Sequence, residues 1–209
     1  MKNRFWALWL SVICVVMFVL QSVYQSFTDA LVLDQSSWFQ PWRFVTSIFL
    51  HGSPSHLIFN LFALILFGLI LEKLIGSNKL LIVYFVSGIV ANLIAVNFYD
   101  SSLGASGAIY GILGCLTILR PKMVVWVYSL PMPMFVATLV WIGIGVIGLF
   151  TPSNTGHVAH LSGIVVGFIL GFFFLRKHGE KKQIVRNYPG FKVVIDEKSM
   201  RNWEDSNLR

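Results

Sequence analysis

The chain is poor in charged residues. Asp, Glu, Lys and Arg make up 12% of its 209 residues, whereas 56% are hydrophobic and the mean hydropathy is +0.74. A water-soluble domain carries about twice that share of charge, because its surface must be solvated. The shortage excludes a single water-soluble core and indicates an integral membrane protein.

Cysteine is also scarce. Cys14 and Cys115 are the two cysteines of the chain, and both fall in apolar segments. Cysteines in such segments usually pack as small buried hydrophobic groups. Their number and positions exclude a disulfide framework and a cysteine-rich metal motif. We expect no cofactor.

The sequence contains several long hydrophobic runs. A membrane-spanning helix needs about 20 apolar residues, and six segments approach that length: Phe5–Tyr24, His56–Ile75, Leu80–Phe98, Ala105–Leu119, Pro133–Phe150 and His157–Leu175. They predict an all-α fold, a polytopic bundle of six transmembrane helices over residues 1–175. The first run follows two cations as a signal peptide does, but no small-residue cleavage site follows it, so we expect a retained helix.

The cations indicate how the bundle is oriented. Cytoplasmic loops of membrane proteins hold an excess of Lys and Arg, and six spans with both termini in the cytoplasm put nearly all cations of this chain there: Lys2, Arg4, Lys73, Lys79, Arg120, Lys122 and those after Leu175. The opposite side of the membrane then holds Arg43 and three acidic residues. Anionic lipid accounts for the net charge of +7, so no nucleic-acid partner is expected.

Two stretches of the chain are not expected to span. Residues 25–54 hold Trp38, Phe39 and Trp42 around Pro41; they predict a loop lying in the outer membrane interface, or equally an ordinary aromatic belt. Residues 176–209 predict a polar cytosolic tail, small or poorly ordered, with a turn signal at Asn187–Gly190.

The fourth segment is too short to cross the bilayer. Ala105–Leu119 covers about 22 Å of a hydrocarbon core about 30 Å thick. Because Arg120 and Lys122 hold its inner end at the cytoplasmic surface, the outer end with Ser106 must lie below the outer surface. Irregular backbone at that depth, here Ser101–Gly104, needs cover by protein or a water-filled cavity.

Glycines predict that the fourth and sixth segments pack closely. His160 is followed by Gly163, Gly167 and Gly171 on one helical face, and the fourth segment carries a stripe of Gly107, Gly111 and Gly114. Small residues let two membrane helices bring their backbones together. This packing would bring Ser106 and His160 toward hydrogen-bonding distance.

Polar side chains gather at the same outer end of the bundle. Histidine is costly inside a membrane and usually functional there; the outer end holds His51, His56, His157 and His160. No Asp or Glu lies on the outer half of a span, since Glu72 belongs to an inner end. We therefore predict a Ser106–His160 dyad, with Ser106 as nucleophile and His160 as base.

Neighbouring residues could support this dyad. His56 and Asn60 are four residues apart on one helical face, and with the Ser106 N–H they suit an oxyanion hole. Tyr110 lies one turn below Ser106 and could stack on the imidazole or orient it in place of a carboxylate.

These motifs resemble the rhomboid intramembrane serine proteases in their six-helix prokaryotic form. The resemblance covers about Trp42 to Leu175 and rests on four motifs: Trp42-Arg43, His51–Asn60, Gly104-Ala105-Ser106-Gly107, and Ala159-His160 with its glycine seam. It implies Ser106 as nucleophile, His160 as base, His56 and Asn60 in the oxyanion site, and Gly104, Gly107 and His51 as supporting residues. It also implies cleavage of single-span transmembrane proteins that enter past a mobile fifth helix, with Thr151–Gly156 as a cap.

Other functions are weaker matches to the sequence. A soluble esterase is excluded, because Gly104–Ala108 lacks the closing glycine of the nucleophile elbow and no strand precedes it. The four outer histidines could bind a divalent metal in a carrier or metalloprotease, although the chain has no HExxH motif and no intramembrane carboxylate; we expect no metal. A scaffold that binds transmembrane helices without cutting them stays open.

Overall fold

The computed structural model describes residues 4–127, 129–151, 155–178, 183–188 and 191–196. In this part of the chain, four apolar helices are long enough to cross a membrane: α1 (Trp6–Val23), α4 (Pro54–Ile75), α5 (Ser77–Ala95) and α8 (His157–His178). Two shorter apolar helices are α6 (Ser106–Leu119) and α7 (Met134–Gly148). All six predicted segments are helical, and the long helices indicate a multi-pass membrane protein.

Helix ends differ from the prediction where local signals determine them. Helix α4 begins two residues early, because the Ser53 side chain accepts a hydrogen bond from His56 N–H and Pro54 occupies the first turn. Helix α5 begins three residues early, directly after Gly76, whose φ of 87° ends α4 without a longer loop. Helix α4 is therefore two residues longer than hydropathy indicates, whereas α5, which ends at Ala95 instead of Phe98, keeps the expected length and is shifted by three residues.

The loop after α1 is folded. It contains α2 (Gln25–Leu31), β1 (Leu33–Asp34), η1 (Gln35–Trp38), α3 (Arg43–Thr46) and η2 (Ser47–Phe49). Strand β1 pairs antiparallel with β2 (Ser101–Ser102), the short strand that precedes α6. The Arg43 guanidinium donates to Asp34 Oδ2 at 3.0 Å and to the carbonyl of Val32 at 2.9 Å. The loop is thus tied to the backbone that leads into α6.

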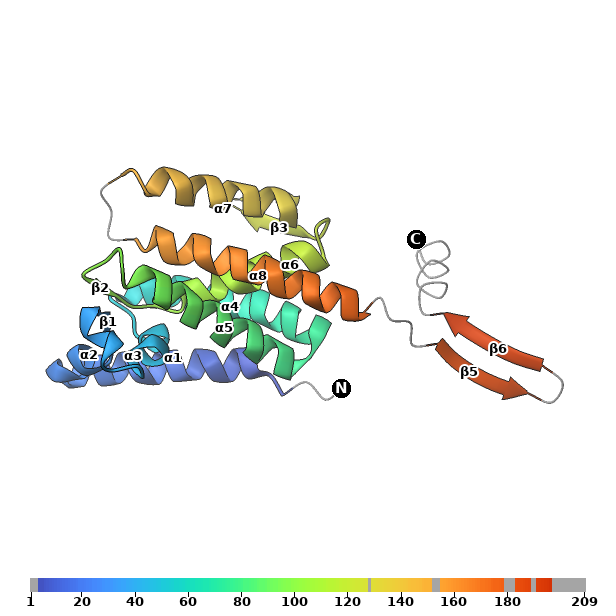
Figure 1. Cartoon of the computed structure of the whole chain (residues 1–209), viewed down its shortest axis with the longest axis horizontal. Helices are drawn as coiled ribbons and strands as arrows, with labels where there is room; N and C mark the ends of the chain where they lie inside the picture. Colours follow the sequence, from blue (N-terminus) through green and yellow to red (C-terminus); the bar gives the residue numbers. More distant parts are fainter. Residues whose placement is uncertain (1–3, 128, 152–154, 179–182, 189–190, 197–209) are drawn as a thin grey trace. The chain divides into compact units, whose positions relative to one another are not determined.

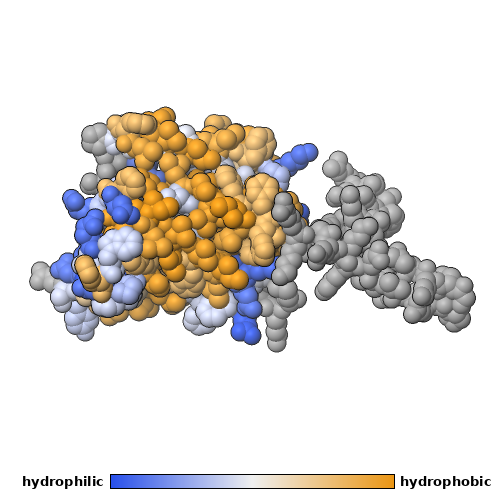
Figure 2. Space-filling model, viewed as in Figure 1, coloured by the Kyte–Doolittle hydropathy of each residue, from blue (hydrophilic) through white to orange (hydrophobic). Residues whose placement is uncertain are grey.

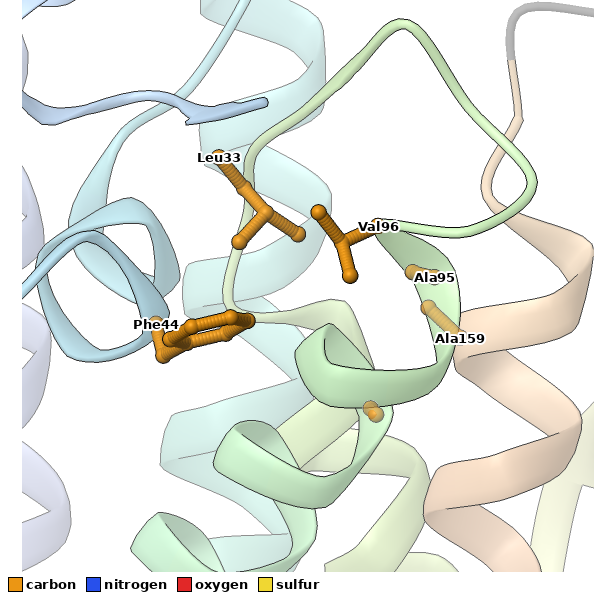
Figure 3. Packing of buried hydrophobic residues seen from close by; sticks show 6 residues of the cluster. Leu33, Phe44, Ala95, Val96 and Ala159 are labelled. Atoms are coloured by element: carbon orange, nitrogen blue, oxygen red, sulfur yellow. The ribbon is translucent and has the colours of Figure 1, made fainter. Parts of the chain in front are cut away.

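A small core joins this loop to the bundle. Leu33 and Phe44 from the loop converge with Val96 at the end of α5, as Figure 3 shows, beside the small side chains of Ala95 and Ala159. Each of these residues is at most 7% exposed. Burial of the two large side chains stabilises the packed loop by about 1.5–3 kcal/mol each.

Glycines set the distance between α6 and its neighbours. A β-carbon at Gly163 or Gly167 of α8 would collide with the carbonyl oxygen of Gly107 or Gly111, respectively. On its other side, a β-carbon at Gly111 would collide with Ser87 of α5. The expected close packing of α6 and α8 is therefore present, and ten of the residues of α6 are buried.

The rest of the helical surface is apolar. Figure 2 shows orange over the middle of one face of the bundle, with hydrophilic colour toward its two ends. Large exposed side chains come from α1, α4, α7 and α8: Trp9, Phe59, Ile147 and Ile169 are each more than half exposed. Such a surface requires a lipid environment.

The N-terminal end of α1 is held by a buried carboxylate. Glu72 of α4 is 1% exposed, and its two oxygens accept the backbone N–H groups of Trp6 and Ala7 and the hydroxyl of Ser77. These donors include the first N–H groups of α1, which have no partner within the helix. Glu72 thus caps α1 from another helix.

Two hairpins were not expected. Strands β3 (Val124–Val127) and β4 (Leu130–Pro133) pair between α6 and α7. Strands β5 (Gln183–Tyr188) and β6 (Phe191–Asp196) pair within the predicted tail and flank the turn signal, whose residues 189–190 lie outside the described ranges. The chain separates into compact units at residues 172/173; the cytosolic location of the tail stays a prediction.

Candidate active site

Ser106 is the first residue of α6, and the chain enters this helix by an irregular path. Gly104 has φ of +130°, a conformation that a side chain makes costly. Its N–H donates to the carbonyl of Ser47 at 2.9 Å, and the Ser47 hydroxyl in turn accepts from the Asn92 amide at 3.0 Å. The backbone before Ser106 is thereby fixed to η2 and α5, and the predicted non-helical run Ser101–Gly104 is present.

His160 lies in the first turn of α8 and reaches across to Ser106. Nε2 of His160 is 2.8 Å from Oγ of Ser106, a hydrogen bond between two half-buried side chains. The contact depends on the glycine seam, because the backbones of α6 and α8 approach at Gly107 and Gly163. The structure therefore brings together the two residues predicted as a dyad.

Tyr110 lies against the other side of this histidine. The rings of Tyr110 and His160 are stacked, with centroids 4.2 Å apart and planes inclined by 11°. Tyr110 follows Ser106 by one helical turn, so a single face of α6 supplies two of the side chains that contact the imidazole. The stack restricts the ring plane, which is the task that a carboxylate performs in a three-residue arrangement.

His56 and Asn60 lie one turn apart on α4, and the His56 ring faces the backbone before Ser106. The His56 ring lies so near Gly104 that a β-carbon there would be 2.9 Å from Nε2 and 3.8 Å from Oγ of Ser106. Asn60 is 7% exposed and donates from Nδ2 to the carbonyl of His56 at 2.8 Å. An amide carries two N–H groups, and this bond uses one of them.

His51 packs its ring against the ring of His56. Its ring is 1% exposed and meets the His56 ring edge-on, with centroids 5.1 Å apart. Its backbone N–H donates to the Gln21 side chain at 3.0 Å, and Gln21 donates back to its carbonyl. Burial, aided by the nearby His56, lowers the pKa of His51 to about 4. A neutral His51 thus supports His56 without adding charge.

The four outer histidines form two pairs. His157 meets His160 edge-on with centroids 6.2 Å apart, and its ring occupies the space beside Gly148 of α7. Among the described residues, no group of three His, Cys, Asp or Glu side chains is placed to hold a metal ion. A cavity of about 610 Å³ opens beside His157, between the ends of α5 and α7 and the start of α8.

Several residues that build the site were not singled out from the sequence. Gln21 holds the His51 backbone, Asn92 holds Ser47, and the Tyr99 hydroxyl accepts the Val158 N–H at the start of α8. A signal existed for two of them, because Gln21 and Asn92 are polar residues inside apolar segments, where an amide must find a partner. Their partners are distant in sequence and could not be read from it.

The family model described as "Rhomboid domain" matches residues 38–177. The rhomboid protease GlpG of Haemophilus influenzae is 31% identical over 173 residues, which cover 78% of this chain and 87% of that protein. The rhomboid protease GluP of Bacillus subtilis is 32% identical over 66% of this chain and 26% of its own length. RHOMBOID-like protein 4 of Arabidopsis thaliana is 34% identical over 72% of this chain and 38% of its own length.

Proposed function

Because the chain belongs to the rhomboid family, we propose that it is an intramembrane serine endopeptidase that cleaves transmembrane segments of other membrane proteins. The observation that carries the proposal is the 2.8 Å hydrogen bond between Oγ of Ser106 and Nε2 of His160. A hydroxyl is a weak nucleophile until an adjacent base accepts its proton. In our proposal this base is His160, which meets Ser106 where the glycine-packed helices α6 and α8 begin.

Cleavage would proceed through an acyl-enzyme. His160 accepts the Ser106 proton as Oγ bonds to the carbonyl carbon of the scissile peptide, and then gives the proton to the leaving amine as the C–N bond breaks. Water, deprotonated by His160, attacks the ester and releases Ser106. Tyr110 keeps the imidazole plane fixed between these two proton transfers.

The oxyanion of this reaction needs donors near Ser106. We assign this role to His56, to the Asn60 amide and to the Ser106 N–H, which lies at the positive end of the α6 dipole. Gly104 supports the role because its missing side chain leaves room for the His56 ring. Gly107 and His51 support it through the α6–α8 contact and the His56 position.

The membrane arrangement follows from the helices and cations. We assign one crossing to each of α1, α4, α5, α6, α7 and α8, which puts both termini on one side. The cation excess assigns that side to the cytoplasm and the start of α6 to the outer side. Helix α6 is 14 residues long, about 21 Å, so its first residue lies below the outer surface.

Substrate would reach Ser106 sideways from the lipid. Helices α7 and α1 have the fewest buried residues of the six helices. In α7 the buried residues are Met134, Ala137, Thr138 and Gly145. Three of the four lie in its first half, where Thr138 shares a hydrogen bond with Thr117 of α6. The second half packs on α8 through Gly145 and Gly148, and we propose that it separates there to admit a single-span protein.

One reconstitution experiment tests the function against its two competitors. The full chain in liposomes with a single-span model substrate should cleave it, and Ser106→Ala or His160→Ala should each abolish cleavage, whereas a chelator should have no effect. Loss of cleavage with chelator alone would favour a metal site. Binding of the substrate without cleavage by the unaltered protein would favour a scaffold.

A further inference from the structure

The hairpin between α6 and α7 has one face made entirely of apolar residues. In the antiparallel register, Val124 lies opposite Pro133 and Trp126 lies opposite Pro131, so these four side chains share a face. Val124 is 63% exposed and Trp126 is 72% exposed. On the opposite face Val125 and Val127 are buried, at 7% and 5% exposed, whereas Leu130 beside the turn is 63% exposed.

Such a hairpin is poorly suited to water. A lone two-stranded hairpin is marginally stable in water, and here the exposed face offers only hydrocarbon and an indole. Pro131 and Pro133 have no N–H group to donate along β4. Burial of the exposed face in lipid would remove the cost of exposing its apolar side chains to water. The indole favours the headgroup level of a membrane.

Two cations stand directly before the hairpin. Arg120 and Lys122 are exposed in the turn that follows α6. This turn is closed by a hydrogen bond from Met123 N–H to Arg120 O, and it is joined to α7 by a bond from Phe135 N–H to Pro121 O. The cations and the apolar face therefore belong to one small folded unit that begins where α6 ends and finishes where α7 starts.

The bundle puts this unit at the level of the membrane surface. Figure 1 shows β3 beside the start of α7, at the end of the bundle opposite β2 and the start of α6. Both flanking helices are apolar, and in the proposed topology both leave the membrane here. An apolar face with an indole next to two exposed cations matches the boundary between acyl chains and anionic headgroups.

We propose that the β3–β4 hairpin is an interfacial anchor: Val124, Trp126 and Pro131 enter the acyl boundary of the bilayer while Arg120 and Lys122 bind the phosphates of anionic lipids. The anchor would hold the start of α7 in the membrane surface. It goes beyond the proteolytic function and is independent of the chemistry at Ser106.

The test follows the fluorescence of Trp126 in the full chain reconstituted into vesicles. The signal of Trp126 is obtained as the difference between the unaltered protein and Trp126→Phe, a change that keeps an apolar ring at an exposed position. Brominated phosphatidylcholine should quench this difference signal, and aqueous iodide should not. Quenching by iodide without quenching by the brominated lipid would overturn the proposal.

The lipid headgroup is tested by a second comparison. Brominated phosphatidylglycerol at the same mole fraction should quench the Trp126 signal at least about twofold more strongly than the phosphatidylcholine, because each cation near the surface favours anionic lipid. The double variant Arg120→Gln/Lys122→Gln should lose this preference and keep the quenching. Equal quenching by both lipids in the unaltered protein would overturn the assignment of the two cations. Because every readout is fluorescence, failure of the anchor is distinguishable from failure of the protease.

Discussion

The imidazole of His56 fills the space beside Gly104 in which a β-carbon would stand. That atom would be 2.8 Å from Cε1 and 2.9 Å from Nε2 of His56, closer than real side chains approach. Residue 104 also has φ of +130°, which favours glycine. Glycine at 104 thus serves both the backbone turn into α6 and the position of the histidine.

Gly104→Ala should therefore inactivate the protease. The added methyl group must either push His56 away from the oxyanion position or shift the backbone before Ser106, so we expect cleavage to fall by about 10²-fold or more. Cleavage of the model substrate and thermal unfolding are measured together. Gly143→Ala is the matched control, because a β-carbon at Gly143 meets no atom within 4 Å. Unaltered cleavage by Gly104→Ala would contradict the assigned position of His56.

Labelling with a fluorophosphonate probe should report the nucleophile directly. Ser106→Ala should remove all labelling, and His160→Ala should slow labelling by about 10²–10⁴-fold, because the hydroxyl loses its base. The measurement is the rate of label incorporation into the folded protein, with the labelled residue located by mass spectrometry. Label on another serine, or equal rates in His160→Ala, would be incompatible with the dyad.

Asn60→Ala should lower the turnover number by less than Ser106→Ala, by about 10²–10³-fold, since one donor of several is lost. Asn97→Ala provides a matched control: Asn97 also donates to the carbonyl four residues earlier, that of Leu93, but it is exposed at the end of α5. The control should keep full turnover. Equal turnover for both variants would remove Asn60 from the site.

Gly167→Ala should destabilise the bundle. The methyl group would collide with the carbonyl oxygen of Gly111, and overpacking of this kind costs about 1–3 kcal/mol. The midpoint of thermal unfolding in detergent should fall, and Gly143→Ala should leave it unchanged or raise it, since alanine favours a helix. An unchanged midpoint for Gly167→Ala would mean that the seam contributes little to stability.

The sequence predicts the parts of this molecule that depend on hydropathy and on helical spacing. Six apolar runs became helices with ends shifted by a few residues, because lipid forces backbone groups to bond within the segment. Ser106 and His160 could be paired because each begins a glycine-striped helix at the same end. Tyr110 followed from its spacing of four residues from Ser106.

What the sequence does not predict are contacts between segments far apart in the chain. The pairing of Leu33 with Ser102 and the bond from Asn92 to Ser47 join residues more than 40 positions apart. The β3–β4 hairpin was missed for another reason: its strands are four residues long and lie between two hydrophobic helices, so their alternation is hidden by the surrounding apolar sequence. In the tail, the sequence indicated the turn at Asn187–Gly190, but the pairing of β5 with β6 was not predicted.

The enclosure of α6 has a consequence for how hydrolytic water is supplied. From Gly107 to Thr117 nearly every residue of this helix is buried by protein, so neighbouring segments enclose α6 below Ser106. In the proposed mechanism, a hydrolytic water molecule would therefore reach Ser106 from the end at which α6 starts. The same packing would prevent water at the proposed site from passing along α6 to the opposite side of the bilayer.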